Sequence, residues 1–156
     1  MPYAEFCVTS NFTFLTGASH PEEIVEQAAA LGYRAIAMTD VNSVAGIIRG
    51  HVAARQAGIQ YIPGARLVLH DPAGLSLLVY PTCMEGYRRL CRLLTLGKRR
   101  AEKGSCRLGL DDVAAHCGGL VAVVMPQDEP DDGCVGLLAH LRGLFDDDRL
   151  SLAARM

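Results

Sequence analysis

Short apolar runs alternate with segments of helical periodicity along the first half of the sequence. Residues 21–31 place Ile24, Ala28 and Leu31 on one face of a helix, and a second helix is expected over residues 43–57. Three apolar runs around these helices predict buried strands: residues 6–9, 34–38 and 59–62. Strand, helix, strand, helix, strand with short connections is typical of a parallel sheet with right-handed crossovers.

The ends of these two helices carry signals of their own. Ser19 and Glu22 have the spacing of a capping box ahead of the first helix. Gly32 suits the position just after that helix, and Gly58 closes the second one. Both helices are therefore expected to end at a glycine.

The second half of the sequence predicts a β-hairpin inserted in the α/β pattern. Residues 65–70 and 75–80 are apolar and flank a turn signal that contains Pro72 and Gly74. The later elements are expected in this order: helices over 84–96 and 110–117, a strand over 120–124, a loop over 126–133, a helix over 134–145 and a strand within 146–156. About five parallel-type strands and one hairpin strand result, which is few for closing a barrel.

The composition is that of a globular chain without a strong electrostatic bias. Half of the 156 residues are apolar and the formal net charge is −2, so binding of nucleic acid would need a local patch. No apolar run is long enough to span a bilayer, and the N-terminus lacks a basic and then apolar leader, so we expect a cytoplasmic protein. The six cysteines form no CxxC pair, which favours reduced, buried thiols over disulfides.

Candidate chemistry is expected at the carboxyl ends of the strands, where ligands bind in α/β folds. Those ends are residues 7–9, 39–41 and 63–66. Asp40 is the only ordinary hard-metal ligand or acid–base side chain among them. A polynuclear hydrolytic centre needs several carboxylates and imidazoles around metals about 4 Å apart, and a single aspartate cannot supply them.

Asp40 also has a structural interpretation. Together with Thr39 it is expected to cap the helix that begins near residue 43, and we favour this role over a metal or phosphate contact. Cys7 is a weaker candidate as a thiolate ligand or nucleophile, because no histidine lies near it in the sequence to activate its thiol.

Three further groups of polar residues have both a structural and a functional interpretation. For the histidines we favour surface or supporting roles over metal binding: His20, His51, His70, His116 and His140. For the acidic trio we favour a turn before a strand over a metal site: Asp146, Asp147 and Asp148. One basic run is a candidate nucleic-acid contact, although a solvated helix end or a domain interface is favoured because no aromatic residues are interleaved: Lys98, Arg99, Arg100, Lys103 and Arg107.

The opening stretch SNFTFLTGASHPEE, followed by LGYRAIAMTD, GYRRLCRLLTLGKRRAEKG and GGLVAVV, carries a family resemblance over nearly the whole chain. The sequence resembles the polymerase-and-histidinol-phosphatase (PHP) domain at the N-terminus of bacterial C-family DNA polymerases, most of all the error-prone, translesion branch. The resemblance implies an α/β fold, a distorted (βα)7 barrel. Residues 1–156 would form about its first two-thirds as one PHP-like domain, with the polymerase palm, thumb and fingers lying downstream.

The resemblance also implies a degenerate metal site. The family's ligand positions fall on Cys7, Thr9, Asp40, Val41, Arg66, Ser76 and a position near Pro126. Only Asp40 keeps a ligand type, and Arg66 puts a guanidinium where the family has a carboxylate. We therefore expect no cofactor here, whereas intact PHP sites bind zinc, manganese or iron and the polymerase uses magnesium. Arg66 is instead a candidate site for an oxyanion such as sulfate or phosphate.

The function implied is that of a structural, interaction-bearing domain of an error-prone DNA polymerase in DNA damage tolerance, inactive by itself. Expected partners are the downstream polymerase domains and damage-tolerance accessory proteins, with only weak DNA binding and no membrane. The alternative is a metal-dependent phosphoesterase with a site rebuilt from Cys7, Asp40 and Asp71. An incomplete barrel would expose strand edges, which predicts some self-association.

Overall fold

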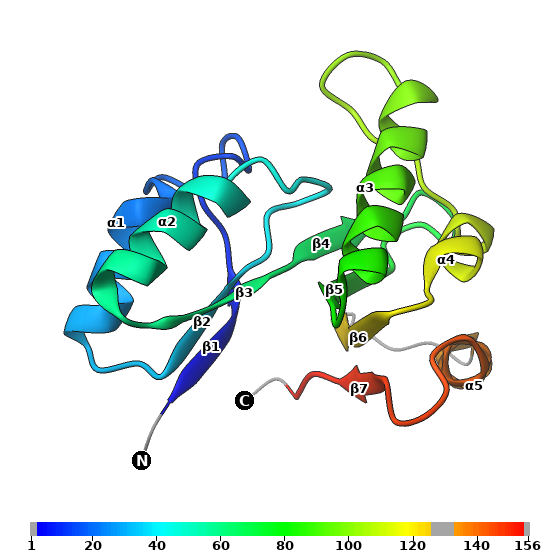
Figure 1. Ribbon diagram of the computed structural model, residues 1–156. Coiled ribbons are helices and arrows are strands. Elements are labelled where there is room, and N and C mark those ends of the chain that lie inside the picture. The colour runs from blue at the N-terminus through cyan, green and yellow to red at the C-terminus, as the bar shows by residue number, and fades with distance from the viewer. Residues whose placement is uncertain (1–2, 126–132, 155–156) are drawn as a thin grey trace. The chain divides into compact units, whose positions relative to one another are not determined.

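The computed structural model describes residues 3–125 and 133–154. The chain divides into two compact units, Met1–Arg66 and Leu67–Met156, hereafter the first unit and the second unit. Each contains its own sheet and helices (Figure 1). The loop predicted at residues 126–133 and the ligand position near Pro126 fall largely outside the described residues.

The first unit is a three-stranded parallel sheet in the order β1-β2-β3 with two crossover helices. Its elements are β1 (Ala4–Val8), α1 (Pro21–Ala30), β2 (Ala35–Met38), α2 (Ile47–Ala57) and β3 (Gln60–Pro63). The predicted strand, helix, strand, helix, strand order and the parallel pairing are confirmed. All four residues of the central strand β2 are buried, as expected for a strand in the middle of a parallel sheet.

The core of the first unit lies where α1 and α2 pack together and against the sheet (Figure 1). Each helix contributes alanines and small apolar side chains, which allow the two helices to approach closely. The buried cluster comprises Val25, Ala28, Ile36, Ala53, Ala54 and Ile59. An ion pair between Arg49 and Glu22 joins the two helices at the surface.

The capping of the first helix and the start of the second differ from those predicted, whereas the glycine ends agree. The first helix is capped by His20, whose backbone N–H donates to Glu23 Oε2 at 2.8 Å, one residue later than the predicted box. The second helix begins at Ile47 instead of residue 43, because the Ser43 hydroxyl accepts locally from the Ala45 N–H and forms a turn first. Gly58 closes that helix in a left-handed conformation, as predicted.

The second unit contains a four-stranded sheet in the order β4-β5-β6-β7, and β4 begins at the last two residues of the first unit. The elements are β4 (Ala65–Val68), β5 (Ser76–Pro81), α3 (Met84–Arg99), α4 (Leu110–His116), β6 (Leu120–Met125), α5 (Gly133–Leu144) and β7 (Leu150–Leu152). Adjacent β4 and β5 form the predicted hairpin, and the Leu69 N–H donates to the Leu75 carbonyl at 2.9 Å beyond the strand ends.

Strand β6 departs from the expected parallel arrangement. It runs antiparallel to β5, with Ser76 opposite Met125 and Pro81 opposite Leu120, and parallel to β7. The reason is that two helices, α3 and α4, connect β5 to β6. One crossover helix returns the chain to the starting end of a sheet, whereas a second one carries it back again, so the next strand enters from the opposite end.

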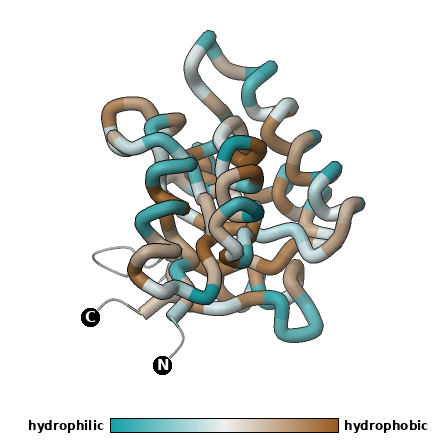
Figure 2. Tube along the Cα trace, turned by 60° about the vertical axis from the view of Figure 1, so that its left-hand side comes forward, coloured by the Kyte–Doolittle hydropathy of each residue, from teal (hydrophilic) through white to brown (hydrophobic). Residues whose placement is uncertain are grey.

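The core of the second unit lies between its sheet and α3. Residues 76–80 of β5 are all buried, and inward positions alternate along β6. Helix α3 contributes Leu90, Leu93 and Leu94, while its opposite face is charged. Figure 2 shows hydrophobic and hydrophilic segments alternating along the helices, as one buried face requires.

The six cysteines are all free, as predicted. The expectation that they are buried is wrong, because Cys7 and Cys83 are exposed and the other four are half-buried. The described residues contain no helix that is long and apolar enough to cross a membrane.

Gly86 provides a test of the second unit's packing. It is buried in the first turn of α3, and a Cβ there would lie 2.1 Å from the Gly119 carbonyl oxygen. Because the obstacle is backbone, we expect Gly86→Ala to lower the free energy of unfolding by about 1–3 kcal/mol, measured by urea unfolding.

Gly136 in α5 is the matched control, since a Cβ there meets nothing within 4 Å. Gly136→Ala is expected to be neutral or to stabilise by up to about 1 kcal/mol through helix propensity. Equal stability of the two variants would contradict the close approach at Gly86.

Candidate functional site

The carboxyl ends of β1, β2 and β3 lie side by side at one edge of the first unit's sheet. Val8 is opposite Met38, and Met38 is opposite Pro63. The chain continues this alignment past the strands, since Thr39 donates to the Val8 carbonyl from its N–H (2.8 Å) and its hydroxyl (3.2 Å). Beyond it, Val41 and Arg66 form an isolated parallel bridge. Cys7, Thr9, Asp40, Val41 and Arg66 therefore all lie at this edge.

Asp40 is the most constrained side chain at this edge, because it is only 2% exposed. Its Oδ1 accepts from the Ser10 N–H and the Thr13 hydroxyl, both at 2.8 Å, and its Oδ2 accepts from the Ser10 hydroxyl at 2.7 Å. A buried carboxylate needs such donors to replace water. The carboxylate thereby ties the segment after β1 to the end of β2.

These contacts correct the predicted helix cap. Helix α2 starts at Ile47 with Gly46 at its N-cap position and no side-chain cap. Asp40 lies seven residues before Ile47, and its carboxylate is directed to Ser10 and Thr13 instead. Thr39 likewise bonds to β1 and caps no helix.

Residues 10–19, hereafter the anchored loop, fold around the Asp40 carboxylate. The Thr13 hydroxyl donates to Asp40 and also accepts from the Val41 N–H at 3.0 Å. Thr13 therefore connects the anchored loop to two consecutive residues that follow β2. The loop closes on itself where the Asn11 N–H donates to the Ser19 carbonyl at 2.9 Å. The sequence did not lead us to predict that Ser10 and Thr13 donate hydrogen bonds to Asp40. The pattern that could have indicated it is a serine and a threonine three residues apart, directly after a predicted strand.

The ligand positions implied by the family resemblance offer a poor donor set for divalent metals. Cys7 presents an exposed thiol, Thr9 a hydroxyl, Val41 an isopropyl group and Arg66 a permanent positive charge. The Asp40 carboxylate already accepts three hydrogen bonds. Neither oxygen atom of that carboxylate is left without a donor.

One further predicted position belongs to the second unit. Ser76 is buried in the second unit, at the start of β5. Among the residues with a described placement, no three histidine, cysteine, aspartate or glutamate side chains gather closely enough to hold a metal ion.

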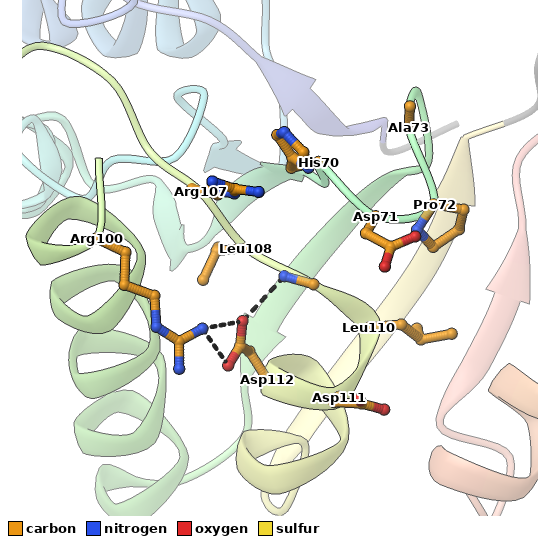
Figure 3. A pocket seen from close by; sticks show the side chains of 11 residues that line it. His70, Asp71, Pro72, Ala73, Arg100, Arg107, Leu108, Leu110, Asp111 and Asp112 are labelled. Atoms are coloured by element: carbon orange, nitrogen blue, oxygen red, sulfur yellow. Dashed lines mark hydrogen bonds and ion pairs between the residues drawn. The ribbon is translucent and has the colours of Figure 1, made fainter. Parts of the chain in front are cut away.

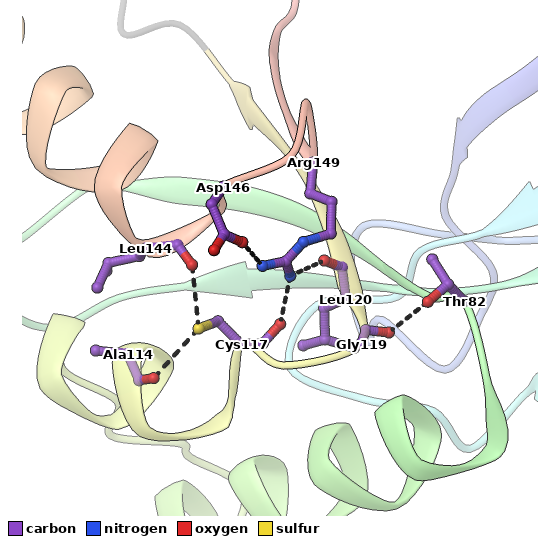
Figure 4. A network of polar contacts seen from close by, with 8 residues as sticks. All are labelled: Thr82, Ala114, Cys117, Gly119, Leu120, Leu144, Asp146 and Arg149. Carbon is purple, nitrogen blue, oxygen red and sulfur yellow. Dashed lines mark hydrogen bonds and ion pairs between the residues drawn. The ribbon is translucent and has the colours of Figure 1, made fainter.

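The acidic trio at residues 146–148 forms the predicted turn before β7 (Figure 4). Asp146 pairs with Arg149, and Asp148 Oδ1 lies 3.0 Å from Arg142. Arg149 also donates to the carbonyls of Cys117 (3.2 Å) and Leu120 (3.1 Å), and so fixes the turn that leads into β6. The turn interpretation is confirmed, with Asp147 and Asp148 both at positive φ.

The histidines occupy dispersed positions. His51, His70 and His140 are exposed. His20 Nδ1 lies 2.8 Å from Asn11 Nδ2, and His116 Nδ1 lies 2.8 Å from the Asp112 carbonyl oxygen. These contacts are supporting ones within the two units.

Part of the basic run lines a pocket of about 830 Å³ in the second unit (Figure 3). Arg100 forms a two-pronged ion pair with Asp112, with both Nη1–Oδ distances at 2.8 Å, and the Gly109 N–H donates to the same carboxylate at 2.9 Å. Burial alone would raise the pKa of Asp112, but the Gly109 N–H and the Arg100 guanidinium, helped by His116, hold it below its ordinary value. Arg107 and His70 line the same pocket.

Comparison with known proteins decides the family. A family model described as the PHP domain matches residues 6–154. The chain belongs to the PHP domain family. An error-prone DNA polymerase of Agrobacterium fabrum is 47% identical over 147 residues, which is 94% of this chain and 13% of that polymerase. The error-prone DNA polymerase of Ruegeria pomeroyi is 41% identical over 179 residues, or 91% of this chain and 16% of the relative.

The PHP assignment agrees with the solved structures that share the fold. A structure from Bifidobacterium adolescentis, provisionally named a metal-dependent phosphoesterase, has a TM-score of 0.69 at 13% identity, covering 89% of this chain and 74% of that one. An amidohydrolase from Chromobacterium violaceum, solved with bound sulfate and no metal, has a TM-score of 0.64 at 14% identity, covering 91% and 73%. The expected α/β fold of the PHP type is thereby confirmed. This PHP chain spans less than one-fifth of the length of the polymerases it matches.

The anchoring role of Asp40 can be tested by Asp40→Asn. The change keeps the shape but points an NH₂ donor at hydroxyl or N–H donors, so we expect the free energy of unfolding to fall by about 1–3 kcal/mol. Hydrogen exchange should also speed up at the amides of Ser10 and Val41, which this network protects.

Asp111→Asn is the matched control, because the Asp111 side chain is exposed and has no hydrogen bond or ion pair with any described residue. It should change stability by less than about 0.5 kcal/mol. An Asp40→Asn protein as stable as the control would contradict the anchoring role.

Proposed function

We propose that this chain is the PHP domain of an error-prone DNA polymerase and that its metal site is degenerate, which leaves it a structural role. The family match over residues 6–154 and identities of 41–48% to error-prone DNA polymerases support the polymerase context. The whole enzyme would be a DNA-directed DNA polymerase that uses magnesium and acts in damage tolerance. Its downstream domains and accessory proteins would be the partners of this domain.

The observation that carries the degenerate site is the state of the Asp40 carboxylate. It is the one carboxylate among the strand-end positions, and it already accepts three hydrogen bonds from Ser10 and Thr13. A metal ion would have to displace hydroxyl and N–H donors that hold the anchored loop. Binding would therefore cost part of the stability of the first unit.

Electrostatics at the same edge argue in the same direction. Arg66 carries a charge that cannot be removed near neutral pH, and its backbone is fixed by bonds to Asp40 and Asn42. A permanent cation at a former carboxylate position repels divalent metals and attracts oxyanions. The proposed oxyanion site at Arg66 remains a prediction. The alternative function, a phosphoesterase whose site is rebuilt from Cys7, Asp40 and Asp71, has weaker support. The Asp40 carboxylate on which that site depends already accepts three hydrogen bonds.

The proposal is tested by restoring the family's ligands. After chelation and dialysis against zinc or manganese, we expect the unaltered protein to hold far less than one metal ion per chain by elemental analysis. A variant carrying Cys7→His, Thr9→His, Val41→His and Arg66→Glu should bind metal, because it gains three imidazoles and a carboxylate at the same edge.

Two results would overturn the degenerate site. One is about three metal ions bound per unaltered chain, the number a polynuclear centre of this family would hold. The other is metal-dependent release of phosphate from a simple ester that Asp40→Asn abolishes. A circular dichroism spectrum shared by all variants is the control for folding.

A further inference from the structure

The basic residues of this chain are concentrated in one segment of the second unit. Residues 84–107 contain eight of the 15 lysines and arginines and only two acidic residues, Glu85 and Glu102. Their formal charge is +6, although the chain as a whole carries −2. The basic run recognised in the sequence, residues 98–107, is therefore the end of a longer basic stretch that includes helix α3.

The fold turns this charge outward. Helix α3 buries Leu90, Leu93 and Leu94 against the sheet, so its charged face is directed to solvent. Arg88 and Arg92, one turn apart on this face, have side chains that are 63% and 68% exposed.

The acidic residues available do not neutralise this face. Glu85 is shared by three arginines, at 3.5 Å from Arg88 and Arg89 and 3.9 Å from Arg92. Towards the other end of the stretch, four cations have no ion pair with any residue whose placement is described: Lys98, Arg99, Lys103 and Arg107. The surface keeps a net positive charge as a result.

A groove of about 690 Å³ runs along this basic face where α3 meets the end of α4. Its polar lining comes from Arg92, Thr95, Arg99, Arg100 and His116, and no acidic residue lines it. Asp112 holds the Arg100 guanidinium in place at 2.8 Å. Because His116 Nδ1 faces the Asp112 carbonyl oxygen at 2.8 Å, that nitrogen carries a hydrogen.

We propose that this basic face and groove, hereafter the α3 groove, bind the phosphodiester backbone of a nucleic acid. Six of the eight cations are arginines, whose planar guanidinium forms paired hydrogen bonds with phosphate oxygens. Arg88 and Arg99 are eleven residues apart, or about 16 Å along the helix axis, which matches the length of about five nucleotides of one strand.

The contacts predicted are to phosphates and not to bases. The lining of the α3 groove contains no phenylalanine, tyrosine or tryptophan ring on which a base could stack. Phosphate contacts carry no sequence information, so binding should be insensitive to sequence and strongly dependent on salt. The inference goes beyond the proposed function, since it requires nothing of the metal site or of Asp40.

The test uses fluorescence anisotropy with a labelled 20-nucleotide single strand and, separately, a duplex of the same length. We expect the double change Arg92→Ala and Arg99→Ala to weaken single-strand binding about tenfold at low salt. The slope of log affinity against log salt should fall by about 1.4, or about 0.7 for each phosphate that is no longer neutralised. Arg92→Lys with Arg99→Lys should keep most of that slope, because the charges remain.

The matched control removes two exposed arginines from the first unit, by Arg34→Ala and Arg55→Ala. It changes the net charge equally and should leave binding nearly unaltered. Equal weakening by both double variants would overturn the proposal, because binding would then follow net charge alone. An affinity unmoved by the Arg92 and Arg99 changes would overturn it as well.

A competitor separates nucleic acid from an acidic protein surface as the occupant. Unlabelled single strand is expected to displace the labelled strand, whereas polyglutamate of the same total charge should not at the same concentration. Equal displacement by polyglutamate would reject a phosphodiester site in favour of a general surface for acidic chains.

Discussion

The buried carboxylate of Asp40 is the constraint on which the first unit depends. An ionised group that is 2% exposed is tolerated only if donors replace the water around it. Ser10 and Thr13 supply those donors, and in doing so they fold the anchored loop onto the end of β2. The same contacts reduce what Asp40 can do chemically, because an oxygen that holds a loop is not available to a metal unless that loop gives up its hydrogen bonds.

At the neighbouring positions Val41 and Arg66, backbone hydrogen bonds contribute to the fold. The Val41 N–H donates to the Thr13 hydroxyl, and Val41 forms a bridge with Arg66. Arg66 in turn donates from its N–H to the Asp40 carbonyl and accepts from the Asn42 N–H. None of these bonds depends on the identity of the side chain at Val41 or Arg66. A change of side chain at these two positions leaves the named backbone bonds in place, whereas a change at Asp40 removes the acceptor of three hydrogen bonds.

The sequence alone predicted much of the fold but little of the site's geometry. Apolar periodicity located the strands and helices of the first unit. Gly58 marked the end of α2 because it adopts the left-handed conformation with which many helices end, and glycine adopts it without strain. The start of α2 was misplaced, since a local serine turn competes with a helix at Ser43. The antiparallel β6 was missed because strand direction depends on how two helices return the chain. The Asp40 network joins residues 27 and 30 positions apart, a separation at which local patterns carry no information.

The oxyanion site proposed at Arg66 and the proposed α3 groove differ in how their positive charge is presented. At the strand ends, Arg66 supplies a single guanidinium, which would bind a single oxyanion. In the second unit, six arginines and two lysines lie within 24 residues that contain only two acidic ones. Such a row would neutralise successive charges on a polyanion, and each further phosphate that it neutralised would release more counterions and strengthen binding. Repetition along α3, rather than the strength of any single site, is therefore what would favour a nucleic-acid strand over a small anion.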